Sequence, residues 1–162
     1  MKIRIRRIGG VLFTGLLLSA TLFIQEARAS ESVAAEVFVI LASEKAGKIA
    51  SALAEIKALR QPPFSSFRTM EVLQKSNVEL KKGEPVTVTL PNGRRLMLKL
   101  KQQMPDGRSK VQLSINRPNK KDYLPLLEVI AKQGEPFFVA GQKYQGGTLV
   151  IGVEIGKRVA RK

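Results

Sequence analysis

The chain has 162 residues, with 28 Lys and Arg against 13 Asp and Glu, so its formal net charge is +15, and it contains no Cys, His or Trp. Without Cys and His there is no thiolate nucleophile, no Ser-His-Asp triad, no disulfide, no zinc site with the usual nitrogen and sulfur ligands and no imidazole pH switch. These absences exclude most common enzyme designs, and the composition by itself does not identify a function.

The first 29 residues have the pattern of a secretory signal peptide. Four basic residues among the first seven precede a 17-residue apolar run, 8–24, and the small-x-small sequence Ala27-Arg28-Ala29 precedes Ser30. A retained membrane anchor is the alternative, because 17 residues lie at the lower limit for spanning a bilayer. We expect cleavage before Ser30 and export to the periplasm or the extracellular space.

The exported part is expected to form a single α+β domain over residues 30–156, followed by a basic C-terminal tail over residues 157–162. Removing residues 1–29 takes away five basic residues and one acidic residue, which leaves a formal charge of +11. A domain of this length buries roughly two thirds of its unfolded surface in one core. Because the chain has no disulfide, that core must be sufficient alone, which fits bacterial export better than a small extracellular scaffold.

The N-terminal part of this domain is predicted to contain a buried strand and one helix. Residues 37–42 form a continuous apolar run, rich in β-branched and aromatic side chains, that is typical of a strand covered on both faces. In residues 43–60, apolar side chains recur at helical spacing, Ser43 is placed to cap, and two prolines follow at 62 and 63. This pattern predicts a helix over residues 43–60 that packs on one face of a sheet.

From residue 64 onward the apolar period changes to two, and turn signals recur at the spacing expected of an antiparallel β-sandwich or open barrel. The expected strands cover 67–73, 78–81, a hairpin over 86–100, 111–115, 124–131, 137–140 and 148–155. Residues 124–131 also fit a helical face, but Pro125 and the strand-rich context favour an extended chain. Residues 148–155 are apolar on both faces and are expected to be central, with residues 37–42 as a candidate neighbour.

The hairpin over residues 86–100 has a register that the sequence specifies. A three-residue loop, Pro91-Asn92-Gly93, pairs Leu90 with Arg94 and Val88 with Leu96, so that all the apolar side chains share one face. A two-residue Asn-Gly loop would split them between the two faces, which burial disfavours.

The next turn, Pro105-Asp106-Gly107, leaves two solutions open. To match Leu98 with Ile115, the chain uses either a two-residue loop at Asp106-Gly107 or a bulge near residues 102–103.

Three segments carry a resemblance to known proteins: residues 62–67 (Pro-Pro-Phe-Ser-Ser-Phe), 90–94 (Leu-Pro-Asn-Gly-Arg) and 136–147 (Pro-Phe-Phe-Val-Ala-Gly-Gln-Lys-Tyr-Gln-Gly-Gly). Through them, residues 62–155 resemble a group of small exported bacterial proteins for which no activity is established. The resemblance implies export and a β-rich domain, and it assigns no role to any residue.

Positive charge on turns and on one strand face is the main functional signal. The candidate binding residues are Arg94, Arg95, Lys99, Lys101, Arg108, Lys110, Lys120 and Lys121, with Tyr144 as an aromatic candidate. If the hairpins stack as a meander, these cations converge at sheet ends and outer faces, where they would bind an anionic envelope surface, a membrane surface included. The alternative is that they only keep sheet edges soluble, although +11 exceeds the charge of roughly 2 to 8 that solubility requires.

These features favour a non-catalytic envelope binding or assembly module, with no cofactor or metal, whose partner is an envelope protein or an anionic envelope surface. The alternative is a nucleic-acid or polyanion binder on a small barrel, which needs aromatic platforms beside the cations. Phe64, Tyr123 and Tyr144 are the aromatic side chains not expected in the core. An atypical hydrolase with a Ser-Lys pair or two glutamates is the third class. The glycine-rich residues 141–147 are interpreted as a wide hairpin turn rather than a ligand loop.

Overall fold

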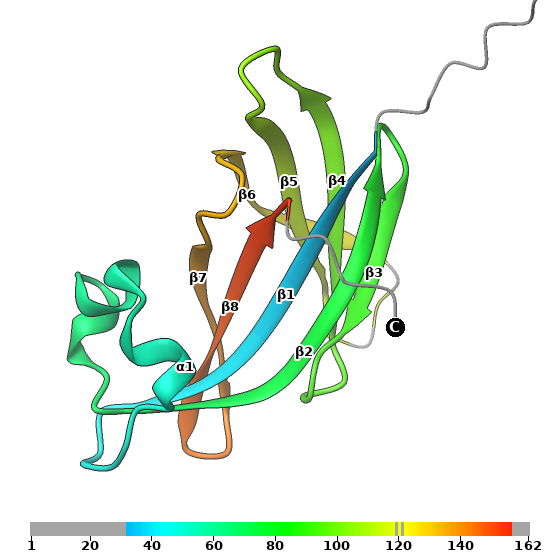
Figure 1. Cartoon of the computed structure of the whole chain (residues 1–162). Helices are drawn as coiled ribbons and strands as arrows, with labels where there is room; N and C mark the ends of the chain where they lie inside the picture. The colour runs from blue at the N-terminus through cyan, green and yellow to red at the C-terminus, as the bar shows by residue number, and fades with distance from the viewer. Residues whose placement is uncertain (1–31, 119, 121, 157–162) are drawn as a thin grey trace, which may run out of the picture.

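The computed structural model describes residues 32–118, 120 and 122–156, which form two four-stranded antiparallel sheets packed around a shared core (Figure 1). The first sheet has the strand order β2-β1-β8-β7 and the second has the order β3-β4-β5-β6. The strands are β1 (Ser32–Ser43), β2 (Thr69–Lys81), β3 (Pro85–Thr89), β4 (Arg95–Gln103), β5 (Ser109–Asn116), β6 (Tyr123–Ala131), β7 (Phe137–Tyr144) and β8 (Gly147–Ile155). The predicted antiparallel sandwich is confirmed, and the sheets do not close into a barrel. The predicted signal peptide, the C-terminal tail and Lys121 lie outside the described residues.

Strand β1 lies inside the first sheet, with β2 on one side and β8 on the other. Val37 and Val39 are inaccessible and belong to the core between the sheets, whereas Phe38 and Ile40 belong to a second core on the outer side. The predicted two-sided burial of residues 37–42 and their pairing with β8 are therefore confirmed.

The outer side of the first sheet is covered by residues 44–68, called the cover below, which lie at one end of β1 and β2 (Figure 1). The cover holds the helix α1 (Ser51–Ala54) and two 3-10 turns, η1 (Lys57–Arg60) and η2 (Phe64–Ser66). The predicted helix over residues 43–60 is wrong, because α1 has only four residues. The prediction that this segment packs on a sheet face is confirmed.

Backbone pairing with β2 takes the place of the predicted helix. Ile49 forms a parallel bridge with Met70, and the main-chain N–H of Ala50 donates to the Met70 carbonyl at 2.9 Å. These backbone groups are thereby satisfied outside a helix. Among the apolar side chains at helical spacing, Leu53 and Leu59 are buried but Ile49 is 43 % exposed, so the segment does not present one continuous helical face.

Aromatic side chains anchor the cover to the first sheet. Phe64 is only 8 % exposed and packs edge-to-face on Phe138, with ring centroids 6.0 Å apart. Gly152 lies opposite both Phe38 and Phe138, and a Cβ atom there would come within 2.4 Å of the Phe138 ring. The expectation that Phe64 lies outside the core is therefore wrong.

Strand β2 is continuous, so the prediction of two separate strands over residues 67–73 and 78–81 is wrong. Lys75, Ser76 and Asn77 all pair with successive residues of β1. The Lys75 ammonium lies 5.3 Å from the centroid of the Phe38 ring. Turn-forming residue types are accommodated here because the long strand β1 supplies backbone partners along the whole segment.

The hairpin of β3 and β4 has the predicted register. Val88 lies opposite Leu96, and the Leu90 N–H donates to the Arg94 carbonyl at 2.7 Å. Gly93 has φ 76°, as a bulged glycine after a type I turn requires. The three-residue loop is confirmed.

The turn after β4 repeats this geometry, with Gly107 at φ 82°. The register shifts at Lys101, so the bulge is the solution adopted. The expected partner is wrong, because Leu98 lies opposite Leu113 rather than Ile115. The same side chains still face the core, because a shift of two residues in the register keeps each side chain on its face of the sheet.

Residues 124–131, whose sequence fits both a helix and a strand, belong to β6, so the strand prediction is confirmed.

Strand β7 continues to Tyr144, and the chain turns into β8 through Gln145 and Gly146, both with positive φ. The wide turn predicted over residues 141–147 is wrong, because a register shift between Ala140 and Lys143 lets pairing with β8 continue.

Candidate functional site

Four cations lie on the outer side of the second sheet and are called the cationic face below: Arg95, Lys99 and Lys101 of β4, and Lys110 of β5. Leu96, Leu98 and Leu100 are inaccessible in the core between the sheets. Because side chains alternate along a strand, Arg95 and Lys99 point away from that core. Among the described residues, these two and Lys101 form no ion pair.

A carboxylate on β6 partly balances this charge. Glu128 Oε1 lies 2.6 Å from Lys110 Nζ. The hydrogen bond from Lys110 is the largest effect and lowers the pKa of the Glu128 carboxyl below its usual value. Desolvation opposes this shift, and the positive charges of Lys110 and Lys101 lower the pKa further. Lys101, Lys110 and Glu128 thus form one electrostatic cluster across β4, β5 and β6, with an excess of positive charge.

Asn116, at the end of β5, holds two of the predicted arginines. Its Oδ1 accepts a hydrogen bond from the Arg95 main-chain N–H at 2.6 Å, and its carbonyl accepts from the Arg94 guanidinium, with Nε at 3.0 Å. Its Nδ2 donates to the carbonyls of Arg117 and Lys120. Asn116 is only 8 % exposed, and through these bonds it positions the Arg94 side chain and the Arg95 main chain. Asn116 was not predicted from the sequence, since its only signal there is an amide beside a basic turn.

An aromatic ring adjoins the cationic face. The Arg95 guanidinium carbon lies 5.8 Å from the centroid of the Tyr123 ring, within reach of a cation–π contact. Tyr123 lies on β6 opposite Asn116. One of the three aromatic side chains expected outside the core therefore lies beside the cations.

The other predicted cations lie at the two ends of the β4–β5 hairpin. Arg108 follows the turn after β4, and its Nε lies 2.6 Å from Asp106 Oδ2. Hydrogen bonds from the Arg108 main-chain N–H and then from its side chain lower the pKa of the Asp106 carboxyl, so this pair is locally compensated. Arg94 and Lys120 lie at the opposite end, around Asn116.

Tyr144 is not brought together with these cations. It lies on β7 of the first sheet and packs against the core between the sheets. It also lines an open cleft of about 610 Å³ between the β7–β8 turn and residues 42–45, together with Lys45, Phe67 and Lys143. Because β4 and β7 belong to different sheets, Tyr144 cannot share the outer side on which the cationic face lies.

Two arrangements bear on the hydrolase alternative. In the same cleft, the Ser43 hydroxyl accepts a hydrogen bond from the main-chain N–H of Lys45 at 3.2 Å, rather than from its ammonium. On the outer side of the first sheet, Glu36 and Glu154 lie opposite each other across β1 and β8. The hydrolase alternative stays a prediction.

Within residues 32–156 as described, no helix is long and apolar enough to cross a membrane. The same residues contain no group of three or more acidic side chains arranged to hold a metal ion.

The fold and the face together define an antiparallel two-sheet sandwich with a cationic outer side. No family model, no curated protein and no solved structure matches the chain.

Proposed function

We propose that the protein is an exported, non-catalytic envelope module that uses the cationic face to bind an anionic surface or an acidic partner of the cell envelope. The observation that carries the proposal is the grouping of Arg95, Lys99, Lys101 and Lys110 on one side of one sheet, beside the single acidic side chain Glu128 in their cluster. The leader sequence of residues 1–29 supports the location.

The size of the expected interaction is sufficient for reversible binding. Each basic residue near an anionic membrane contributes on the order of 1 kcal/mol, so four cations together supply a few kcal/mol. Exposed charges are screened over about 8 Å at physiological salt. Binding should therefore weaken steeply as salt concentration rises.

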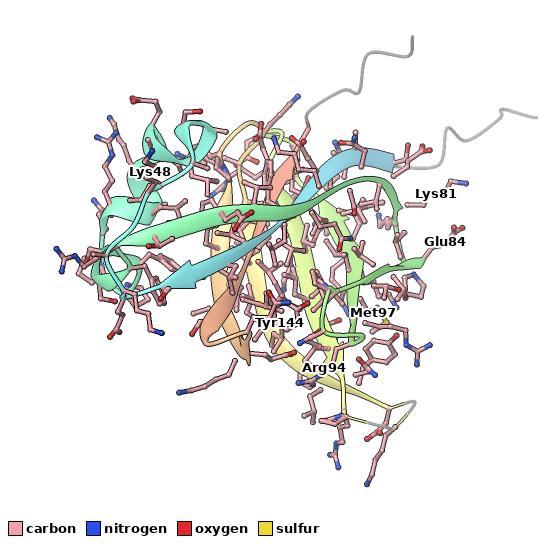
Figure 2. All side chains as sticks on the ribbon, turned by 90° about the horizontal axis from the view of Figure 1, so that it is seen from below. Lys48, Lys81, Glu84, Arg94, Met97 and Tyr144 are labelled. Carbon is pink, nitrogen blue, oxygen red and sulfur yellow. The ribbon has the colours of Figure 1, made fainter. Side chains whose placement is uncertain are left out.

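The test compares two charge reversals of equal size. The first variant carries Lys99→Glu and Lys101→Glu on the cationic face, and the second carries Lys48→Glu and Lys57→Glu, both exposed on the cover. Figure 2 shows Lys48 at the opposite end of the molecule from Met97, a β4 residue between the cations. Co-sedimentation with envelope fractions and retention by inorganic polyphosphate are measured over a salt series.

We expect the face variant to bind at least about 30-fold more weakly at low salt, since two attractions become repulsions. The cover variant should lose much less, because only its net charge has changed. Equal losses in the two variants would show that net charge and not the cationic face governs binding, which would contradict the proposal.

A nucleic-acid or polyanion binder is the second candidate, and the contact between Arg95 and Tyr123 is the observation that favours it. Under this alternative, Tyr123→Ala should weaken binding to a single-stranded oligonucleotide by about 10-fold and leave binding to polyphosphate unchanged. Mass spectrometry of the protein recovered from the envelope separates the two candidates further, because the envelope function requires an N-terminus at Ser30.

A further inference from the structure

Exposed apolar side chains gather on strand β6, at the edge of the cationic face. Of the four large hydrophobic side chains exposed among the described residues, three lie on this strand: Leu124 at 40 %, Leu126 at 38 % and Ile130 at 48 %. The fourth, Ile49, lies on the cover. Single exposed hydrophobic residues are common on protein surfaces, but several on one strand indicate an interaction site.

The register places much of this apolar strip on the same side as the cations. Ile130 lies directly opposite Lys110, whose ammonium reaches Glu128 two residues away on β6. Pro125 lies opposite Ser114, and the register shift beside it leaves Leu126 in a bulge. Ile130, Leu126 and the ring of Tyr123 thus border the cationic face along its β6 edge.

The same strand is poorly suited to pair with a strand of another protein. Strand β6 ends the second sheet, but Pro125 has no N–H to donate and the bulge at Leu126 interrupts the regular edge. Proline, bulges and charged side chains are the features by which proteins block edge-to-edge pairing. The backbone edge of β6 is therefore protected from pairing with another strand, while its apolar side chains stay exposed to solvent.

We propose that β6 and the cationic face together dock on a phospholipid bilayer that contains anionic lipids. Leu126 and Ile130 enter the boundary between headgroups and acyl chains, and Lys99, Lys101 and Lys110 contact the headgroup phosphates. Interfacial binding of this kind depends on buried apolar area together with attraction to anionic lipids. Long lysine side chains are suited to it, because their apolar stems lie along the apolar surface while the ammonium stays in water. The inference rests on the proposed function and names its partner.

The first experiment removes the apolar contribution and keeps the charge. A variant with Leu126→Ser and Ile130→Ser is compared with Ile49→Ser, which removes an equally exposed side chain from the cover. Binding is measured to vesicles with and without anionic phospholipid and to soluble polyphosphate. We expect the β6 variant to bind anionic vesicles about 20-fold more weakly and polyphosphate as before, and Ile49→Ser to change neither.

The outcomes separate this inference from the proposed function. If the β6 variant binds anionic vesicles as tightly as the parent while the Lys99→Glu and Lys101→Glu variant does not, the contact is purely electrostatic; the bilayer inference is then wrong and the proposed function stands. If neither variant changes vesicle binding, the bilayer inference is wrong, and if the Lys99→Glu and Lys101→Glu variant also binds polyphosphate and envelope fractions like the parent, the proposed function is wrong too. If the β6 variant instead loses an envelope protein captured by the parent and keeps the vesicles, β6 docks on protein, which also overturns the inference.

A second measurement does not depend on the stability of the double variant. Because the chain contains no Trp, Ile130→Trp introduces a single indole on β6, and Ile49→Trp introduces one on the cover. On addition of anionic vesicles, the emission of the β6 indole should shift to shorter wavelength and become protected from a soluble quencher, and that of the cover indole should not. An unshifted β6 indole on vesicle-bound protein would show that β6 stays in water.

Discussion

The two sheets of this protein differ in what their outer sides carry. On the first sheet, Phe38, Ile40 and Val150 face outward and are buried in a second core beneath the cover. On the second sheet the outward positions of β4 carry Arg95, Met97 and Lys99, and the described residues form no core cluster there.

This difference explains why one outer side is covered and the other is open. Apolar side chains on both faces of a strand can be buried only if a second layer packs over them. Strand β4 alternates between apolar and polar residues, so its outer side has little apolar surface that a second layer could bury. The open side is therefore the one available to a partner, and the following predictions test this contrast from the largest expected effect to the smallest.

The first prediction concerns the anchor of the cover. Phe64→Ala should lower the free energy of unfolding by about 3 kcal/mol, because it opens a cavity in the second core. Ile130→Ala, at an exposed position of the other outer side, should change it by at most about 0.5 kcal/mol. Urea denaturation of both variants measures the contrast. Equal effects would mean that the cover is not part of the cooperative fold.

The second prediction concerns the close approach of two rings over Gly152. Gly152→Ala should lower the free energy of unfolding by about 2 kcal/mol, since its Cβ atom would overlap the Phe138 ring. Adding Phe138→Leu should reduce this cost, so that the double variant is more stable than the two single effects predict. Strict additivity in the thermodynamic cycle would argue that the rings do not restrict this position.

The third prediction concerns the carboxylate beside the cationic face. Glu128→Gln should strengthen binding to anionic vesicles about threefold at neutral pH, because it removes a negative charge from the cluster. The folded-state pKa of Glu128 is lowered, so the stabilisation from its pair with Lys110 is present above the usual pKa of 4.5 and is lost as pH falls through the lowered value.

Binding and stability measured between neutral pH and pH about 3 check this prediction. The parent should gain vesicle affinity relative to Glu128→Gln only below the usual pKa of the carboxyl, where Glu128 becomes protonated. A parent and variant with the same affinity at neutral pH would place Glu128 outside the contact surface.

Features with partners nearby in the chain could be predicted from the sequence. The register of the β3–β4 hairpin follows from one loop and from the requirement that Val88 and Leu96 share a face. The cover shows the opposite case. The apolar spacing of residues 43–60 is compatible with a helix, but a bridge between Ile49 and Met70 lies outside any local window. The continuity of β2 likewise depends on β1.

The candidate site likewise has features that the sequence predicted and features that it did not. Placement of Arg95 and Lys99 on one face follows from strand alternation and was predictable. The neighbour of Arg95 was not, because Tyr123 and Tyr144 are equally plausible aromatic partners until their strands are assigned to sheets. The hydrogen bonds of Asn116 to four neighbouring residues also appear only in the folded chain.

The amino-acid sequence alone determined a leader pattern, a β-rich chain, a hairpin register and an excess of positive charge, because each depends on residue types or on neighbours a few positions apart. Only the tertiary structure decided which sheet face is covered, which aromatic ring meets the cations and which strand exposes its leucines. Those properties depend on contacts between residues far apart in the chain, whose geometry no local pattern contains.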